Sequence, residues 1–373
     1  MIRIVLVGGG SGGHFYPLIA VAEQINEYKR KGLDVDLYYI GTEAYNKTDL
    51  EANNIKFIYC PSGKKRKYFS LLNYLDIFKI IYGFFVAVYK LFVLYPDVVF
   101  SKGSYTSVPV TLACFILRIP VVVHESDTRP GSANKLAAKF ARYVAISFEE
   151  VAEYFPASKT QLTGIPLRRA FVETISNPIQ ELGLPNDKPL LFVTGGSLGA
   201  ERLNSLILES LDELLPLYII LHQTGDVHAQ AVESFAASKI SDVKLLEQYF
   251  VKGTLTAREI NAAESAAVLV ISRAGTGSIY EIAEKGKPAI LIPIPESISH
   301  DQKTNAYAYA RIGAASVLEE ANLTDGLLAS EISRIIGNEV MYTAMQNSAR
   351  SFGHQNASLT LADALIGIAQ EHS

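Results

Sequence analysis

The sequence has few features that would stabilise the protein outside a reducing compartment. Only two cysteines, Cys60 and Cys114, occur among its 373 residues, which excludes a disulfide framework and shows no metal-ligand spacing. No low-complexity stretch interrupts the chain, and the residues before its first glycine loop are too few for a signal peptide. These absences predict a cytoplasmic protein.

Carboxylate pairs suited to acid/base catalysis are also lacking. Asp34 and Asp36 have the spacing of a known type of metal-binding pair. However, they lie at the start of an expected strand, away from the edge of the sheet where ligands bind. We interpret them as solvated residues, and the sequence predicts no metal site.

Acidic residues are scarce between residues 55 and 120. This segment holds nine basic residues and two acidic ones, so its net charge is +7 while the rest of the chain carries −11. Within it, residues 77–95 form an apolar run as long as a membrane span, interrupted by Lys79 and Lys90. Three interpretations remain open: a core-facing helix, a basic apolar surface resting on anionic lipid, or a spanning helix.

A chain of this length predicts two domains. Apolar runs that read as strands alternate with helical segments in both halves, which is typical of parallel sheets covered on both faces. We therefore expect two doubly wound, Rossmann-like α/β domains that face a cleft: residues 1–165 and 166–350, with residues 351–373 forming a helix that packs back on the first domain. Expected strands lie at residues 2–7, 35–40, 98–101, 120–124, 143–147, 190–194, 218–223, 243–246, 267–271 and 289–293.

A glycine loop, Gly8-Gly-Gly-Ser-Gly-Gly-His14, follows the first expected strand, and a helix is expected from residue 17. The loop matches the dinucleotide-binding fingerprint, which would make the protein a dehydrogenase with Asp36 or Glu43 on the ribose. It can equally present backbone N–H groups to a sugar or a pyrophosphate. His14 is a candidate general base, or else a histidine that packs against the adjacent helix.

Two further loops occupy the same position in the second half. Gly195-Gly-Ser-Leu-Gly199 follows one expected strand, and Ser272-Arg-Ala-Gly275 follows another, with a helix expected from Ile279. Unpaired N–H groups at such a helix start favour phosphate, and Glu281 lies within plausible reach of a sugar hydroxyl. A nucleotide that contains a ribose fits this arrangement.

Polar residues follow other expected strands. His124-Glu-Ser-Asp127 offers carboxylates for sugar hydroxyls or for orienting a base, or else forms a solvated turn. Arg168, at the expected domain junction, can pair with a diphosphate or form a surface ion pair. The segment His300-Asp-Gln-Lys-Thr-Asn305 brings further polar side chains to the edge that holds Gly275.

Taken in order, these motifs resemble the MurG family of N-acetylglucosaminyltransferases. The resemblance runs from residue 2 to about residue 315 and rests on five ordered motifs. It implies a glycosyltransferase B fold, and transfer of GlcNAc from UDP-GlcNAc to the membrane-bound acceptor lipid I, giving lipid II. The anomeric centre inverts, and neither a metal nor a cofactor takes part.

The resemblance also implies roles for particular residues. His14 is the base, and Glu281 binds the ribose. The partners implied are the UDP-GlcNAc donor, a lipid-linked acceptor and an anionic membrane surface contacted by residues 64–95, at the cytoplasmic face of the plasma membrane. No nucleic acid is among them. The substrate-binding residues implied are Ser11, Gly12, Gly13, Asp127, Arg168, Ser197, Thr276, Gly277, Ser278, Ile279, Tyr280, Glu281 and Gln302.

The sequence departs from the family pattern at three places. Asp127 stands where the family usually has an asparagine that contacts the donor sugar, and Lys102-Gly-Ser replaces a glycine-rich run. Ser11 replaces a common threonine, which keeps the hydroxyl. Three alternative functions therefore remain: a lipid glycosyltransferase with another acceptor, a UDP-GlcNAc epimerase, and a non-catalytic subunit that binds a UDP-sugar.

Overall fold

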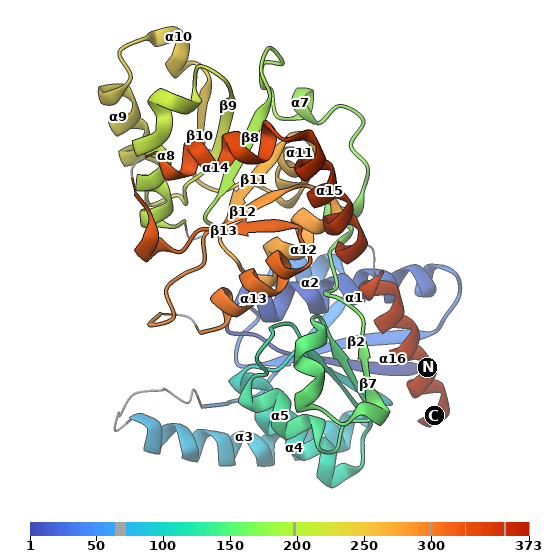
Figure 1. The fold of residues 1–373 in the computed structure, drawn as a ribbon. Coiled ribbons are helices and arrows are strands. Elements are labelled where there is room, and N and C mark those ends of the chain that lie inside the picture. Colours follow the sequence, from blue (N-terminus) through green and yellow to red (C-terminus); the bar gives the residue numbers. More distant parts are fainter. Residues whose placement is uncertain (64–71, 197–198, 299, 325, 354–355, 373) are drawn as a thin grey trace. The chain divides into compact units, whose positions relative to one another are not determined.

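The computed structural model describes residues 1–63, 72–196, 199–298, 300–324, 326–353 and 356–372. It divides into two compact units (Figure 1). Unit 1 comprises Met1–Arg169 and Gln355–Ser373, and unit 2 comprises Ala170–His354. Each unit has a parallel sheet with helices on its faces, so the expectation of two doubly wound α/β domains is confirmed.

Unit 1 is built on a seven-stranded sheet in the order β3-β2-β1-β4-β5-β6-β7, with every neighbouring pair parallel. The order reverses between β1 and β4, and ligands of such sheets bind outside the carboxyl ends of the strands at this switch point. The strands are β1 (Ile2–Val7), β2 (Val35–Gly41), β3 (Ile55–Tyr59), β4 (Val98–Ser101), β5 (Val121–Glu125), β6 (Tyr143–Ile146) and β7 (Thr160–Leu162).

Side chains that alternate along β1 enter two separate cores. Ile4 and Leu6 pack with the helices on one face, whereas Val5 and Val7 pack with those on the other. Both faces are covered, which explains why the strand reads as a continuous apolar run. The helices of unit 1 are α1 (Gly12–Arg30), α2 (Lys47–Ala52), α3 (Leu72–Leu94), η1 (Tyr105–Ser107), α4 (Val108–Leu117), α5 (Ser132–Ala138), η2 (Glu149–Tyr154), η3 (Ala157–Lys159) and α16 (Ala357–His372), and α6 (Arg169–Val172) begins at the boundary with unit 2.

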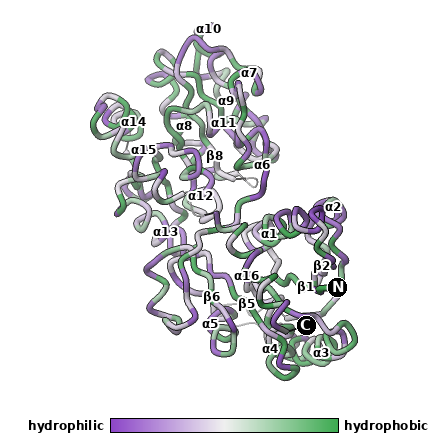
Figure 2. Tube along the Cα trace, turned by 90° about the vertical axis from the view of Figure 1, so that its right-hand side faces the viewer, coloured by the Kyte–Doolittle hydropathy of each residue, from purple (hydrophilic) through white to green (hydrophobic). Residues whose placement is uncertain are grey.

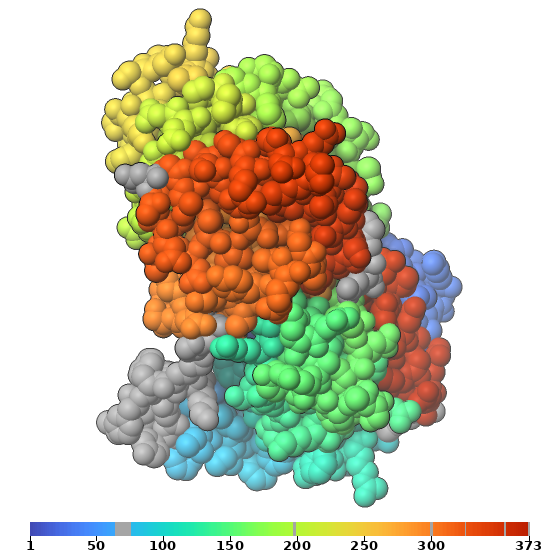
Figure 3. Space-filling view, viewed as in Figure 1, coloured from blue at the N-terminus to red at the C-terminus, as the bar shows by residue number. Residues whose placement is uncertain are grey.

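Helix α3 carries the apolar run, and only one side of it is buried. Ala87 and Leu91 pack into the core, and Gly83 lies so close to the preceding loop that an added Cβ would be 1.9 Å from the carbonyl oxygen of Pro61. By length and composition, residues 76–94 form the one candidate membrane span among the described residues, with 17% of that window buried. The interpretation as a core-facing helix therefore holds only for the buried side of α3. The helix reaches the surface (light blue in Figure 3), most of its residues are hydrophobic (Figure 2), and many of its large apolar side chains are exposed.

Unit 2 repeats the same topology in a six-stranded parallel sheet with the order β10-β9-β8-β11-β12-β13. Its switch point lies between β8 and β11. The strands are β8 (Leu190–Thr194), β9 (Ile219–Gln223), β10 (Tyr249–Lys252), β11 (Leu269–Ser272), β12 (Ala289–Leu291) and β13 (Ala315–Val317).

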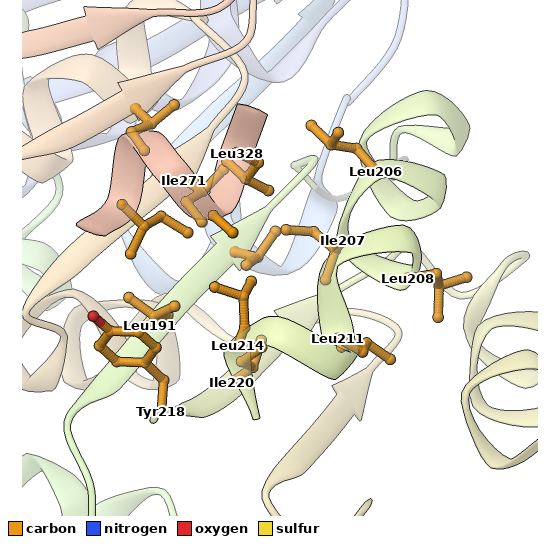
Figure 4. Packing of buried hydrophobic residues seen from close by; sticks show 14 of the residues in the cluster. Leu191, Leu206, Ile207, Leu208, Leu211, Leu214, Tyr218, Ile220, Ile271 and Leu328 are labelled. Atoms are coloured by element: carbon orange, nitrogen blue, oxygen red, sulfur yellow. The ribbon is translucent and has the colours of Figure 1, made fainter. Parts of the chain in front are cut away.

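The apolar residues of α8 recur at helical spacing and fill one core of unit 2. Leu203, Ile207, Leu211 and Leu214 are buried against β8, β9, β11 and α14 (Figure 4). The helices of unit 2 are α7 (Pro178–Glu181), α8 (Glu201–Leu214), α9 (Ala229–Lys239), α10 (Val243–Leu246), α11 (Ala257–Ala266), α12 (Thr276–Glu284), α13 (His300–Arg311), η4 (Glu320–Asn322), α14 (Leu327–Ile336) and α15 (Glu339–Gly353).

Three local predictions were wrong. Residues 243–246, expected as a strand, form the short helix α10, because Asp242 caps it by accepting the N–H of Lys244 at 2.9 Å. Helix α1 begins at Gly12 rather than at residue 17, and α12 begins at Thr276 rather than at Ile279. The glycines at both starts tolerate helical geometry, so the two ligand loops are shorter than their glycine content indicated.

Candidate functional site

The loop after β1 lies at the switch point of unit 1 and turns sharply into α1. Gly9 and Gly10 have φ values of 154° and 79°, and a Cβ on Gly9 would lie 2.7 Å from the Tyr39 hydroxyl. That hydroxyl donates a hydrogen bond to the Gly8 carbonyl, and this bond stabilises the turn. Ser11 is the extended N-cap of α1, so Gly12 and Gly13 are its first residues. The three predicted loop residues thus lie at a helix N-terminus, where backbone N–H groups favour an anion or a sugar oxygen.

His14 lies in the first turn of α1 and is only partly exposed. Its Nδ1 is 2.9 Å from the Ser11 hydroxyl, which orients the ring. Burial, reinforced by the positive charge of Lys102, lowers the pKa of His14 to about 4, although Asp127 acts in the opposite direction. The imidazole is therefore neutral at pH 7 and able to accept a proton.

The segment after β5 is an ordered turn rather than a solvated one. Glu125 is buried, and its carboxylate accepts the N–H groups of Ser126 at 2.9 Å and Asp127 at 3.2 Å. The same carboxylate accepts the N–H of Gly131 at 2.9 Å and an amide hydrogen of Asn134 at 3.0 Å. Asp127 is thereby held at the carboxyl edge of the sheet that also carries His14.

Arg168 falls in unit 1, in the segment that follows β7. Its guanidinium lies over the ring of Tyr16, a residue of α1, at 4.1 Å from the ring centroid. Its predicted role as a diphosphate ligand stays a prediction. Asp36, by contrast, forms an ion pair with Lys56 at 2.8 Å and lies 3.9 Å from Lys29, as befits a residue near the start of a strand.

In unit 2, the loop after β8 approaches its neighbours closely. Gly199 has a φ of 74°, and an added Cβ would lie 2.0 Å from the carbonyl oxygen of Thr224. The N–H of Gly196 donates to the hydroxyl of Thr194 at 3.0 Å. Ser197, the predicted diphosphate ligand of this loop, lies outside the described residues. A side chain at position 199 would clash with the backbone of Thr224, so only glycine fits there.

The predicted nucleotide-binding residues 276–281 form the first turn and a half of α12, on the other side of the switch point. Gly275 is the N-cap, so Thr276, Gly277 and Ser278 supply the N-terminal N–H groups. A Cβ on Gly277 would lie 3.9 Å from Oε1 of Glu281, which places that carboxylate beside the helix start. The residues predicted to bind phosphate and ribose thus lie within about one helical turn of each other.

Burial and hydrogen bonds define which groups near the start of α12 can meet a ligand. The side chains of Ile279 and Tyr280 are buried, so only their backbone can meet a ligand. Asn305 donates to the hydroxyl of Thr276 at 3.2 Å. Gln302 accepts the N–H of Ile294 at 3.2 Å, which leaves its amide nitrogen as the group that can donate to a ligand.

Two buried charged residues, to which the sequence analysis assigned no functional role, interact electrostatically with these sites. Glu264 is buried, and its pKa is raised well above the usual value by burial and by the nearby carboxylate of Glu281. Lys102 is buried directly after β4. A charged residue directly after a short buried strand was the available signal for Lys102, whereas Glu264 lies within an ordinary amphipathic helix and gave none.

Comparison with known proteins places this geometry in a family. Residues 4–146 match the glycosyltransferase family 28 N-terminal domain, and residues 190–361 match its C-terminal domain. The chain belongs to glycosyltransferase family 28. Membership of this family excludes the dehydrogenase interpretation of the first glycine loop. It confirms the expectation that the chain is a hexosyltransferase.

Individual members of family 28 match nearly the whole chain. A protein from Bacillus cereus is 36% identical over 92% of this chain and 94% of its own length, and one from Clostridium kluyveri is 35% identical over 90% and 91%. Both are named UDP-N-acetylglucosamine–N-acetylmuramyl-(pentapeptide) pyrophosphoryl-undecaprenol N-acetylglucosamine transferase. The crystal structure of Acinetobacter baumannii MurG superposes with a TM-score of 0.75 at 25% identity, covering 98% of this chain and all of that one. The glycosyltransferase B fold is thus confirmed.

Proposed function

We propose that this protein transfers GlcNAc from UDP-GlcNAc to undecaprenyl-pyrophosphoryl-MurNAc-pentapeptide, giving lipid II for peptidoglycan synthesis. The observation that carries the proposal is that relatives matching nine-tenths of the chain are all named for this one activity. The geometry supports it, because both switch points hold glycine loops that run into helix N-termini. Through lipid II, the protein would serve cell shape and cell division.

Unit 2 is the proposed donor site. The diphosphate of UDP lies at the N-terminus of α12 and the loop after β8, where Ser197 contributes, and Gln302 donates to the sugar. Glu281 accepts hydrogen bonds from the ribose hydroxyls. A charged acceptor of this kind contributes about 1.5–3 kcal/mol to binding, and a helix start offsets phosphate charge without a metal.

Replacing Glu281 with Ala is expected to weaken UDP binding about tenfold or more, because the ribose loses its charged partner. Titration of UDP by isothermal calorimetry measures the effect. Glu284→Ala, on the same helix one turn further from its start, is the matched control and should bind UDP like the wild type. Unchanged affinity in the Glu281 variant would remove the ribose role.

Unit 1 is the proposed acceptor site. An acceptor sugar hydroxyl attacks the anomeric carbon, and the bond from that carbon to the β-phosphate oxygen breaks as the new glycosidic bond forms. UDP leaves with the bonding electrons, and His14 takes the hydroxyl proton. His14 suits this role because it is neutral at pH 7 and is oriented by Ser11 at the helix start.

The membrane contact is proposed to run through the outer side of α3. Phe78, Tyr82, Phe85, Tyr89 and Phe92 recur at spacings of three and four residues, and each is 64–69% exposed. We call these five residues the α3 stripe. Such a stripe suits burial in the interface of a bilayer, where aromatic side chains are favoured. It supports a peripheral location at the cytoplasmic face of the plasma membrane.

The deciding experiment measures UDP release from UDP-GlcNAc in EDTA, with and without a short-chain lipid I analogue. Acceptor-dependent release with a GlcNAc-containing lipid product is expected. Release without any acceptor would favour an epimerase, and release only with a diacylglycerol would favour another lipid acceptor. Binding of UDP-GlcNAc with no turnover would favour a non-catalytic subunit.

A further inference from the structure

Lys102 occupies the centre of the unit 1 switch point. It directly follows β4, its N–H donates to the carbonyl of Val7 at 2.9 Å, and its side chain is 1% exposed. The next residue, Gly103, has a φ of 82°, and a Cβ there would lie 2.6 Å from the side-chain oxygen of Asn134. The backbone around Lys102 is therefore tightly fixed.

A buried ammonium needs compensation, and the turn after β5 supplies it. Nζ of Lys102 donates to the hydroxyl of Ser126 at 2.6 Å. Burial lowers the pKa of Lys102 to about 8, while the carboxylates of Glu125 and Asp127 act to raise it. Lys102 thus remains a cation at pH 7, and its charge is balanced by that turn.

Lys102 also lies beside the first turn of α1. A Cβ on Gly8 would lie 3.0 Å from Cβ of Lys102 and 2.8 Å from the carbonyl oxygen of His14, so Gly8 lies between the base of the lysine side chain and the His14 backbone. The charge of Lys102 acts on the His14 imidazole and lowers its pKa. The titratable groups whose electrostatic interactions involve Lys102 are His14 from α1 and, from β5 and its turn, His124, Glu125 and Asp127.

We propose that Lys102 is a positioning residue for the transfer reaction, whose ammonium orders the Ser126–Asp127 turn beside His14 and offsets the negative charge of Asp127. Two of the departures from the family pattern, Lys102 and Asp127, are then one coupled feature. Without Lys102, the Asp127 carboxylate would attract a proton to the imidazole. The inference rests on the proposed role of His14 as the base.

The test is a double-mutant cycle. Lys102→Met is expected to lower kcat about tenfold to a hundredfold, since it frees the turn beside the reacting groups, with KM for UDP-GlcNAc unchanged. The acid limb of the pH profile should move to higher pH. Lys102→Met/Asp127→Asn should be more active than Lys102→Met alone, whereas additive losses would overturn the coupling. Lys139→Met, an exposed lysine of the same unit, is the control and should match the wild type.

A second measurement needs no turnover. The titration of His14 is followed by 15N NMR of the full-length protein with labelled histidine, and the signal is assigned by its loss in His14→Gln. The midpoint should rise in Lys102→Met and fall in Asp127→Asn, and an unchanged midpoint in both would overturn the proposal. If Lys102→Met does not fold, Asp127→Asn alone decides. If the wild type does not transfer GlcNAc, the proposed function fails, yet this result still decides the role of Lys102.

Discussion

Replacing His14 with Ala is expected to lower kcat by a factor of about 10² to 10⁴, the range that a positioned general base contributes. The affinity for UDP should stay the same, because the proposed nucleotide site is built from residues 276–281 of unit 2, whereas His14 lies in unit 1. Steady-state kinetics with saturating lipid acceptor measure the first quantity, and UDP titration measures the second. Equal losses in both would mean that His14 has a structural role.

The pH dependence of the wild type gives an independent check of the same base. Its pKa is lowered to about 4, so the imidazole is unprotonated and active at every pH well above that value. We expect kcat/KM to stay level from pH 7 down to about pH 5 and to fall only as the pH approaches 4. A histidine with the ordinary pKa of about 6.5 would instead lose half of its activity near that pH.

His228 provides the matched control for the substitution. It is a partly buried histidine at the N-cap of α9 in unit 2, and it is not among the predicted site residues. His228→Ala should keep the wild-type kcat. A comparable loss in both variants would show that the assay responds to general damage rather than to the missing base.

Replacing Phe78, Phe85 and Phe92 of the α3 stripe with Ser is expected to weaken binding to anionic vesicles at least about a hundredfold. Each aromatic side chain contributes about 1.5–3 kcal/mol when it is fully buried, and three losses outweigh the modest contribution of nearby lysines. Co-sedimentation with phosphatidylglycerol vesicles measures the change. UDP-GlcNAc binding should remain intact, because the stripe belongs to unit 1 and the proposed donor site belongs to unit 2.

A control variant with three exposed valines of unit 2 tests whether the loss is specific. Val227, Val243 and Val340 are 67–89% exposed, and their replacement with Ser should leave vesicle binding unchanged. Equal binding of the stripe variant and the wild type would refute the proposed surface. The electrostatic share is tested separately by changing Lys64, Lys65, Arg66 and Lys67, which lie outside the described residues, to Gln and by raising the salt concentration.

The sequence was most informative where strands are buried on both faces. The strands at residues 2–7, 98–101 and 190–194 were predicted with their observed bounds, because continuous apolar runs ended by glycine or polar residues leave little ambiguity. Parallel pairing then placed the ligand loops at one edge of each sheet. Edge strands gave a weaker signal: β3 exposes Lys56 and Tyr59, so its pattern does not stand out from that of a loop.

The candidate site was predictable as a set of loops, but its internal chemistry was not. His14 is held neutral by its burial and also by the charge of Lys102, which is 88 residues away in sequence and adjacent only through the pairing of β1 with β4. Likewise, the sequence left open whether Glu125 serves a ligand or belongs to a solvated turn, and only its hydrogen bonds to Ser126, Asp127, Gly131 and Asn134 reveal that it shapes the turn. Patterns among residues close in the sequence do not predict such contacts, because burial and charge balance depend on the tertiary fold.

The last helix, α16, has a consequence for the order in which the protein is made. Leu361 and Leu365 of α16 complete the core formed by β1 and α1, so unit 1 is assembled from both ends of the described chain. During synthesis, unit 2 is made before α16, so this face of unit 1 still lacks its cover while unit 2 is being completed. Apolar surface of the first-made half therefore stays open until α16 has been made, and a nascent chain stalled near residue 350 would present it to chaperones.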